Sequence, residues 1–194
     1  MGGGSKVMEF RVFRKTFSLL EEFLIYKSGK ELYRAKQEGF FLKNFRVLSG
    51  KRHVISIFQN ISIYVSRYTF YIQDESPEFA RGFKIISKGI LKKHFQCYFL
   101  ENKYDLYIHT ALAYSIFKND IQIAEIKKTE IDSFGENEYI AKCNSDVDNY
   151  IMAVFLILIN YKGFYKLSFF YGLVNISLGG VFESKKVNKD WNPQ

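Results

Sequence analysis

Residues 150–159 read YIMAVFLILI, the longest unbroken apolar stretch of the chain. Ser145 stands three residues before Asp148, a spacing typical of a helix N-terminus. The sequence therefore predicts a helix over residues 146–162. A helix that is apolar on every side must be surrounded by protein, and ten apolar residues are too few for the roughly 20 that cross a bilayer. We expect this helix to be buried.

The chain before this helix has the pattern of β-strands. Apolar and polar residues alternate in runs of four to eight, rich in Ile, Phe, Tyr and Val. Turn sequences separate the runs at Ser28-Gly29, Ser49-Gly50, 118–120 and 134–137. Their spacing predicts a meandering antiparallel sheet. Because about a dozen strands would expose edges if left open, we predict a mainly β fold: a closed antiparallel barrel of about twelve strands around a buried C-terminal hydrophobic helix.

Three segments, in this order, resemble the tubby C-terminal-like domain family, which includes phospholipid scramblases and LURP-one-related proteins. They are the hairpin sequence at 24–33, the strand phrase IQIAEIKK at 121–128, and the acidic stretch at 144–148 that leads into the terminal helix. The resemblance covers about residues 9–162. It implies a closed twelve-stranded barrel around the helix.

The sequence predicts one folded domain over residues 8–163. Residues 1–7 are expected to be a linker of the kind added in cloning, or disordered. Residues 164–182 depart from the family pattern, and the alternation over 173–178 favours an additional β-element. An apolar tail associated with a membrane stays an alternative for this segment. Residues 183–194 are expected to form a polar end.

Composition excludes several protein classes. The chain has 194 residues, of which 47% are hydrophobic, 25% charged and 18% aromatic, as in an ordinary globular domain and unlike a disordered or collagen-like chain. Two cysteines, Cys97 and Cys143, are too few for a disulfide framework or a four-cysteine zinc site. Without an export signal we expect both to be reduced thiols of a cytoplasmic protein.

The common enzyme motifs do not occur in the sequence. GxGxxG, GxxxxGK[ST], GxSxG and HExxH are all missing. We therefore expect a protein that is not an enzyme, with no catalytic residue, no metal and no cofactor. A histidine beside a carboxylate in a cleft would favour an enzyme instead. The three histidines, His53, His94 and His109, could meet only through folding. Two carboxylate pairs are also candidates, Asp105 with Asp120 and Glu21 with Glu22, although the latter two, as adjacent strand residues, point to opposite faces.

Asp146 and Asp148 correspond in place to acidic residues of the scramblases, which are proposed there as calcium ligands. Calcium takes six to eight oxygen ligands, more than this short stretch offers. The N-terminus of a helix favours aspartate on electrostatic grounds alone. We expect these residues to cap the helix, and calcium-dependent scrambling is not carried over.

Positive charge is concentrated in the first half of the chain. Residues 1–100 contain 18 Lys and Arg against 8 Asp and Glu, whereas the remainder contains 10 against 12. Two stretches, 39–73 and 79–100, contain basic residues and no acid. If neighbouring strands bring them together, they form one positive face that attracts phosphate-rich partners. The candidate lipid- or anion-binding residues are Lys43, Arg46, Lys51, Arg52, Arg81, Lys84, Lys88, Lys92 and Lys93.

The sequence thus predicts a non-enzymatic, cytoplasmic domain that binds anionic membrane lipid, of the phosphoinositide type, as a peripheral protein. The resemblance supports this, because tubby domains bind phosphoinositide head groups through a basic surface. A solvated basic face is the plainer interpretation of the same residues. Nucleic acid is a less expected partner, because aromatic residues at alternating strand positions usually face a core. The alternative is a structural or protein-interaction module that forms oligomers through residues 164–182.

Overall fold

The computed structural model describes residues 7–15, 20–39, 44–60, 67–73, 82–88, 94–109, 112–130, 137–161 and 191–193. These residues form twelve strands and one helix: β1 (Met8–Lys15), β2 (Glu22–Lys27), β3 (Lys30–Glu38), β4 (Asn44–Ser49), β5 (Arg52–Asn60), β6 (Arg67–Ile72), β7 (Phe83–Lys88), β8 (His94–Phe99), β9 (Asn102–Ile108), β10 (Ala113–Lys118), β11 (Ile121–Glu130), β12 (Asn137–Cys143) and α1 (Asn149–Asn160).

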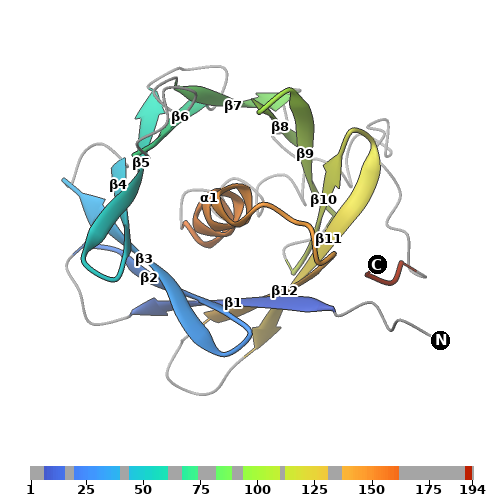
Figure 1. Cartoon of the computed structure of the whole chain (residues 1–194), viewed down its shortest axis with the longest axis horizontal. Helices are drawn as coiled ribbons and strands as arrows, with labels where there is room; N and C mark the ends of the chain where they lie inside the picture. Colours follow the sequence, from blue (N-terminus) through green and yellow to red (C-terminus); the bar gives the residue numbers. More distant parts are fainter. Residues whose placement is uncertain are drawn as a thin grey trace, which may run out of the picture.

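The strands form a closed antiparallel barrel (Figure 1). Each strand pairs with its neighbours in sequence, and β1 pairs with β12, with Met8 opposite Cys143, to close the ring. Closure leaves none of these twelve strands with an unpaired edge that could recruit another chain. The predicted mainly β fold, a closed barrel of twelve antiparallel strands with one C-terminal helix, is confirmed.

Tight turns join the hairpins at one end of the barrel. Ser28 and Gly29, with φ of 50° and 81°, form the predicted turn between β2 and β3. Asn119 and Asp120, with φ of 48° and 67°, form the predicted turn between β10 and β11. These left-handed conformations suit two-residue hairpin turns, which require positive φ. The predicted segment 134–137 lies outside the described residues except for its last residue, which begins β12.

Two other turns differ from the prediction. The turn between β4 and β5 is formed by Gly50 and Lys51, one residue later than predicted, because Ser49 still pairs with Arg52 in the ladder. A turn at Leu100 and Glu101, with φ of 43° and 61°, joins β8 to β9. Neither turn residue is a glycine or an asparagine, and no turn was predicted there; Asn102, which follows, donates from its side-chain amide to the carbonyl of Leu100 at 2.8 Å.

The helix α1 lies within the ring of strands in Figure 1. Residues 151–159 are each at most 1% exposed. At its beginning, the ring of Tyr150 stacks on that of Tyr33 from β3, with centroids 6.2 Å apart. Just after its last turn, Tyr161 meets Phe45 from β4 edge to face at 5.8 Å. Among the described residues, no helix is both long and apolar enough to span a membrane.

The helix begins at Asn149, three residues later than predicted. The carboxylate of Asp148 accepts hydrogen bonds from the backbone N–H groups of Tyr150, at 2.8 Å, and Ile151, at 3.1 Å. The prediction of a capping box that starts at Ser145 is wrong, because Asp148 itself is the N-cap. Residues 162 and 163, and the segment 164–182, lie outside the described residues.

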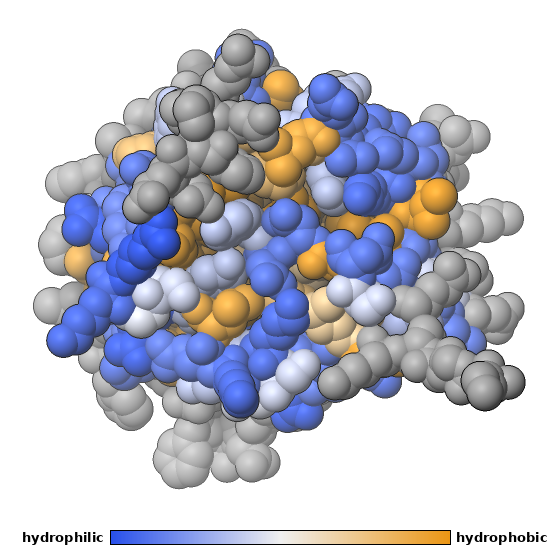
Figure 2. Space-filling model, viewed as in Figure 1, coloured by the Kyte–Doolittle hydropathy of each residue, from blue (hydrophilic) through white to orange (hydrophobic). Residues whose placement is uncertain are grey.

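The end of the barrel that faces the viewer in Figure 1 is mixed in character. Figure 2 shows hydrophilic residues there, interrupted by separate hydrophobic patches rather than by one continuous apolar surface. Single exposed apolar residues are normal on proteins, so this end of the barrel does not by itself indicate a binding site. The informative surfaces lie along the outer faces of the strands, where side chains point away from the barrel interior.

Candidate functional site

Exposed aromatic and basic side chains share the outer face of β5–β8. We call Phe58, Arg67, Tyr71, Lys84 and Tyr98 the aromatic–basic face. Phe58 is 38% exposed, Tyr71 36% and Tyr98 62%. Arg67 and Lys84 are also exposed. Large exposed aromatic side chains are unusual enough in a monomeric domain that a group of them indicates a binding surface.

The strand register makes these residues neighbours. Phe58 lies opposite Thr69, and Thr69 lies opposite Lys84. Ile85 of β7 lies opposite Cys97 of β8. Because these strands are antiparallel, the next pair in the register is Lys84 with Tyr98. With about 4.8 Å between adjacent strands, Phe58 and Tyr98 lie within about 15 Å of each other.

The rings of Phe58 and Tyr71 pack against one another edge to face, with centroids 5.8 Å apart. Tyr71 also lies over Gly82, where a Cβ atom would come within 2.7 Å of its Cε1 atom. A side chain at position 82 would therefore push the ring away from the strand. Glycine at this position lets Tyr71 lie close against its neighbour.

Among the described residues, the strands that form the aromatic–basic face carry no compensating acid. Strands β4–β8 contain no Asp or Glu. Neither Arg67 nor Lys84 forms an ion pair with another described residue. By contrast, Arg46 on β4 is engaged, because its Nε atom lies 2.7 Å from Oε1 of Glu38 on β3. Within the described part of the chain, neither Arg67 nor Lys84 therefore has an ionic partner that would compete with a bound anion.

The structure brings together only part of the predicted basic set. Arg46 and Lys84 share the outer surface, with β5 and β6 between them. Lys51 and Arg52 lie at the β4–β5 turn, at one end of the barrel, and Lys88 is the last residue of β7. The predicted residues outside the described part of the chain are Lys43, Arg81, Lys92 and Lys93.

Sequence reasoning missed Arg67 and the three rings. The alternation in β6 was visible, but both of its faces carry aromatic residues. Tyr68 and Phe70 point into the core at 4% and 0% exposure, whereas Tyr71 is 36% exposed. Period alone does not say which of two aromatic faces is outward. The basic flank of Arg67 and Lys84 was the only available signal.

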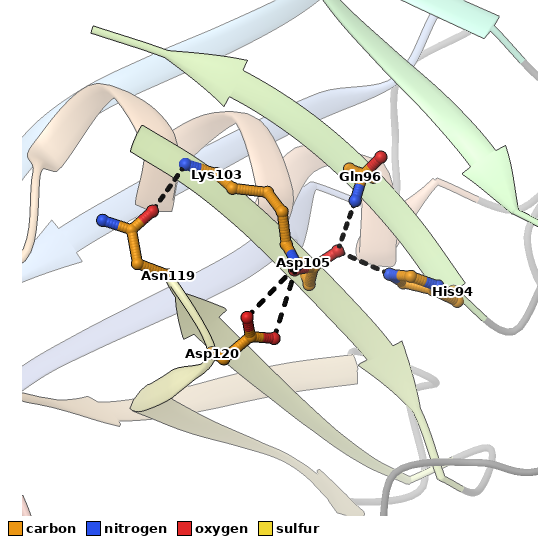
Figure 3. Close-up of polar contacts among 6 residues, drawn as sticks. All are labelled: His94, Gln96, Lys103, Asp105, Asn119 and Asp120. Atoms are coloured by element: carbon orange, nitrogen blue, oxygen red, sulfur yellow. Dashed lines mark hydrogen bonds and ion pairs between the residues drawn. The ribbon is translucent and has the colours of Figure 1, made fainter. Parts of the chain in front are cut away.

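A second cluster, the Asp105 network, lies on the outer face of β8–β10 (Figure 3). Asp105 is only 1% exposed, and its Oδ1 atom accepts hydrogen bonds from Nε2 of His94 at 2.6 Å and from Nε2 of Gln96 at 3.1 Å. Its Oδ2 atom lies 3.2 Å from Nζ of Lys103. The contact with Asp105 is the main reason why the pKa of Lys103 is raised. A buried carboxylate needs such partners to remain ionised.

The Asp105 network ties two hairpins together. The ammonium of Lys103 also lies 3.4 Å from Oδ1 of Asp120, and its backbone N–H donates to Oδ1 of Asn119 at 2.9 Å. Asn119 in turn donates to Oδ1 of Asn102 at 2.8 Å. Asp105 and Asp120, considered from the sequence as a carboxylate pair, therefore share a lysine. Such a contact holds the barrel wall and does not pair two acids for proton transfer.

The three histidines occupy separate places. His53 contacts Ser56, His94 stacks on Tyr107 with centroids 4.3 Å apart, and His109 contacts Ser115. Burial lowers the pKa of His109. Among the described residues, His94 forms an ion pair with the carboxylate of Asp105, whereas Glu125 acts on His109 only through its charge. Within the described ranges, no three His, Cys, Asp or Glu side chains are grouped so that they could hold a metal ion.

The cysteines and the first carboxylate pair are structural. Burial raises the pKa of both Cys97 and Cys143 to about 12, which keeps them as unreactive thiols at neutral pH. Glu21 and Glu22 have different basic partners: the former lies 3.3 Å from Arg14 and the latter 3.6 Å from Lys15.

Comparison with known families bears on the fold. The model of the family described as LURP-one-related (LOR) matches residues 8–160. The chain belongs to the LURP-one-related family. The match runs from the start of β1 to the end of α1, and the family is related to the tubby-like and scramblase domains, as the sequence resemblance predicted. No curated protein and no solved structure shows a significant match to the chain.

Proposed function

We propose that this LURP-one-related barrel is a non-enzymatic domain that binds the surface of anionic membranes through its aromatic–basic face. The observation that carries the proposal is the placement of two cations, Arg67 and Lys84, among exposed aromatic rings on strands that contain no acid. Aromatic side chains with basic neighbours suit the boundary between lipid head groups and acyl chains. On this proposal the protein acts peripherally, at a cytoplasmic membrane surface.

The number of charges limits how strongly this face can bind. Each basic residue near an anionic surface contributes about 1 kcal/mol, and the attraction falls off within about 10 Å at 0.1 M salt. Arg67 and Lys84 alone would give weak, salt-sensitive binding. Head groups with several phosphates, such as phosphoinositides, offer the most charge to this small set of cations.

The remaining chemistry supports a binding domain over an enzyme. The carboxylate of Asp105 is 1% exposed and is occupied by three partners. Both thiols are buried and protonated at neutral pH. Catalytic groups need to reach a substrate, whereas these groups are engaged in holding the barrel together.

Co-sedimentation with vesicles tests the proposal. The protein and an Arg67→Glu/Lys84→Glu variant are compared on neutral and on phosphoinositide-containing vesicles, at low and at near-physiological salt. We expect the unmodified protein to bind only the anionic vesicles, and the variant to bind about 30-fold more weakly. A Lys30→Glu/Lys142→Glu variant, with the same change of net charge at exposed positions elsewhere on the barrel, is the matched control.

Two results would contradict the proposal. If the unmodified protein fails to bind anionic vesicles at low salt, where attraction is strongest, the membrane function is wrong. If the control variant loses as much binding as the Arg67→Glu/Lys84→Glu variant, net charge alone acts and the aromatic–basic face is not the site.

A further inference from the structure

We infer that the rings of Phe58, Tyr71 and Tyr98 insert into the interfacial layer of the bilayer, so that the aromatic–basic face is an insertion surface as well as an electrostatic one. The inference rests on the proposed function and adds the type of contact made there. The partner is a lipid bilayer, and the contact is apolar as well as ionic.

Exposed apolar residues are concentrated on this wall. Among the described residues, seven large hydrophobic side chains are exposed, and four of them lie between β5 and the β8–β9 turn: Phe58, Tyr71, Tyr98 and Leu100. A charge-only site would not need these rings in water, where their exposure costs solubility. Their grouping around Lys84 therefore requires a partner that covers apolar surface.

The rings are already arranged for insertion. Phe58 and Tyr71 hold each other edge to face at 5.8 Å, and Tyr71 lies against Gly82. They are carried on β5 and β6, two paired strands of a closed barrel, rather than on a loop. Rigid aromatic groups lose little conformational freedom on binding, so most of their burial becomes affinity.

The position of Lys84 also suits a face whose rings enter the interfacial layer of the bilayer. Lys84 lies opposite Thr69 of β6 on one side. On the other side, the register of β7 with β8 places it beside Tyr98. A lysine stem can lie along apolar groups while its ammonium stays at the level of the phosphates. The tyrosine rings would enter the interfacial layer with their hydroxyl groups in the polar region, as in the aromatic belts of membrane proteins.

A nucleic acid fits this face less well. Proteins that bind nucleic acid through the backbone make many phosphate contacts, on the order of six to ten for typical duplex binders. The aromatic–basic face has two cations, Arg67 and Lys84, against three exposed rings. That ratio favours a partner with much apolar surface and a modest density of negative charge.

Insertion is tested with a single tryptophan placed on the face. The chain contains only one tryptophan, Trp191, so a Tyr98→Trp/Trp191→Phe variant reports from the face alone. It is mixed with phosphatidylcholine/phosphatidylserine vesicles whose acyl chains carry bromine. We expect a blue shift and a loss of about half of the emission. The matched control is Ile121→Trp/Trp191→Phe, where residue 121 is 69% exposed on β11, and its emission should not change.

A second variant measures what the rings contribute. Phe58→Ser/Tyr98→Ser removes two exposed rings and leaves both cations in place. At near-physiological salt we expect vesicle affinity to fall about tenfold, because the salt-resistant part of binding is lost. Unchanged circular dichroism and an unchanged urea midpoint show that this variant is still folded.

The outcomes separate the two claims. The protein could bind anionic vesicles while a tryptophan at position 98 is not quenched and the ring variant keeps its affinity. That result overturns insertion and leaves the proposed function unaffected. Failure of the unmodified protein to bind any anionic vesicle overturns both. Quenching by a single-stranded oligonucleotide, with no response to vesicles, would show that the rings stack on bases and would overturn the lipid partner.

Discussion

The outer faces of the two halves of the barrel differ although the strands alternate in the same way. On β5–β8 the outward residues Phe58, Tyr71 and Tyr98 are 36–62% exposed. On β9–β12 the outward residues Asp105, Ser115 and Glu138 are at most 6% exposed. The second wall buries these three polar side chains, although Ile121 on the same wall is 69% exposed, whereas the first wall leaves a group of aromatic rings in water. Burial of polar groups has a structural explanation, so the unexplained exposure of rings indicates where a partner binds.

The C-terminal end of the chain contacts the β9–β12 wall and so adds to the difference between the two walls. The indole Nε1–H of Trp191 donates to the backbone carbonyl of Gln122 on β11 at 3.1 Å, and Figure 1 draws this end of the chain beside β11. The pairing of β10 with β11 shifts register between Ile116 and Phe117 at this place. Such an irregularity interrupts the ladder, and here the side chain of Trp191 uses a strand carbonyl.

The largest expected effect is on the β9–β12 wall. Replacing Asp105 with Ala removes the common acceptor of His94 and Gln96 and the anion beside Lys103. We expect the free energy of unfolding to fall by about 2 kcal/mol, less than for a fully buried pair because water can reach the partners. Urea unfolding followed by circular dichroism measures it. Asp120→Asn, at a position 68% exposed where φ is 67°, is the control; asparagine tolerates this conformation, so the midpoint should not change. Equal midpoints for all three proteins would show that the Asp105 network does not stabilise this wall.

A smaller effect is expected at the contact between the chain end and β11. Trp191→Phe keeps an aromatic ring and removes the hydrogen bond to the carbonyl of Gln122. The expected loss is about 1 kcal/mol of unfolding free energy, the usual contribution of one hydrogen bond. The same urea titration detects it. An unchanged midpoint would mean that the contact forms without contributing stability, and that the β9–β12 wall is held by its side-chain network alone.

The sequence was sufficient for the fold because the fold depends on local signals. Alternation marked the strands, Ser28-Gly29 and Asn119-Asp120 marked turns, and the run at 150–159 marked the helix. Each signal acts over a few residues, and a closed barrel of sequential hairpins adds few choices of topology. The turn at Leu100 and Glu101 was not predicted.

The candidate site was predicted less well because it depends on pairing between strands. Arg46 was counted as a free cation within an acid-free stretch, but Glu38 on the neighbouring strand neutralises it. Arg67, isolated in sequence, joins Lys84 only through the register of β6 and β7. Charge along the chain shows where cations are frequent, whereas the pairing of strands decides which of them stay unpaired.

The exposed wall should tolerate a change that displaces its surface ring. In Gly82→Ala the new Cβ would lie within 2.7 Å of the Tyr71 ring, so the ring must move outward. Because that ring is exposed, we expect unfolding free energy to change by less than about 0.5 kcal/mol. Urea unfolding checks this, with Gly82→Ala/Tyr71→Ala as the control that removes the ring and leaves the methyl group of Thr69, which would lie 2.9 Å from the new Cβ atom. A loss above 1 kcal/mol that the second substitution relieves would show that the ring is held firmly and that the exposed wall is as tightly packed as the other.

The smallest expected effect concerns pH and belongs to the β9–β12 wall. Burial lowers the pKa of His109 below its ordinary value of 6.5, an effect that Glu125 partly opposes. The unfolded chain therefore binds a proton more readily than the folded one, so this residue makes stability fall as pH decreases through 6.5 towards the lowered pKa. In His109→Gln the decline in urea midpoint between about pH 7.5 and about pH 5.5 should be shallower than in the unmodified protein. His53 and His94 are unchanged in both proteins, so the difference isolates His109. Identical slopes would show that His109 is no less accessible to protons than in the unfolded chain, and that this wall is open to water at Ser115.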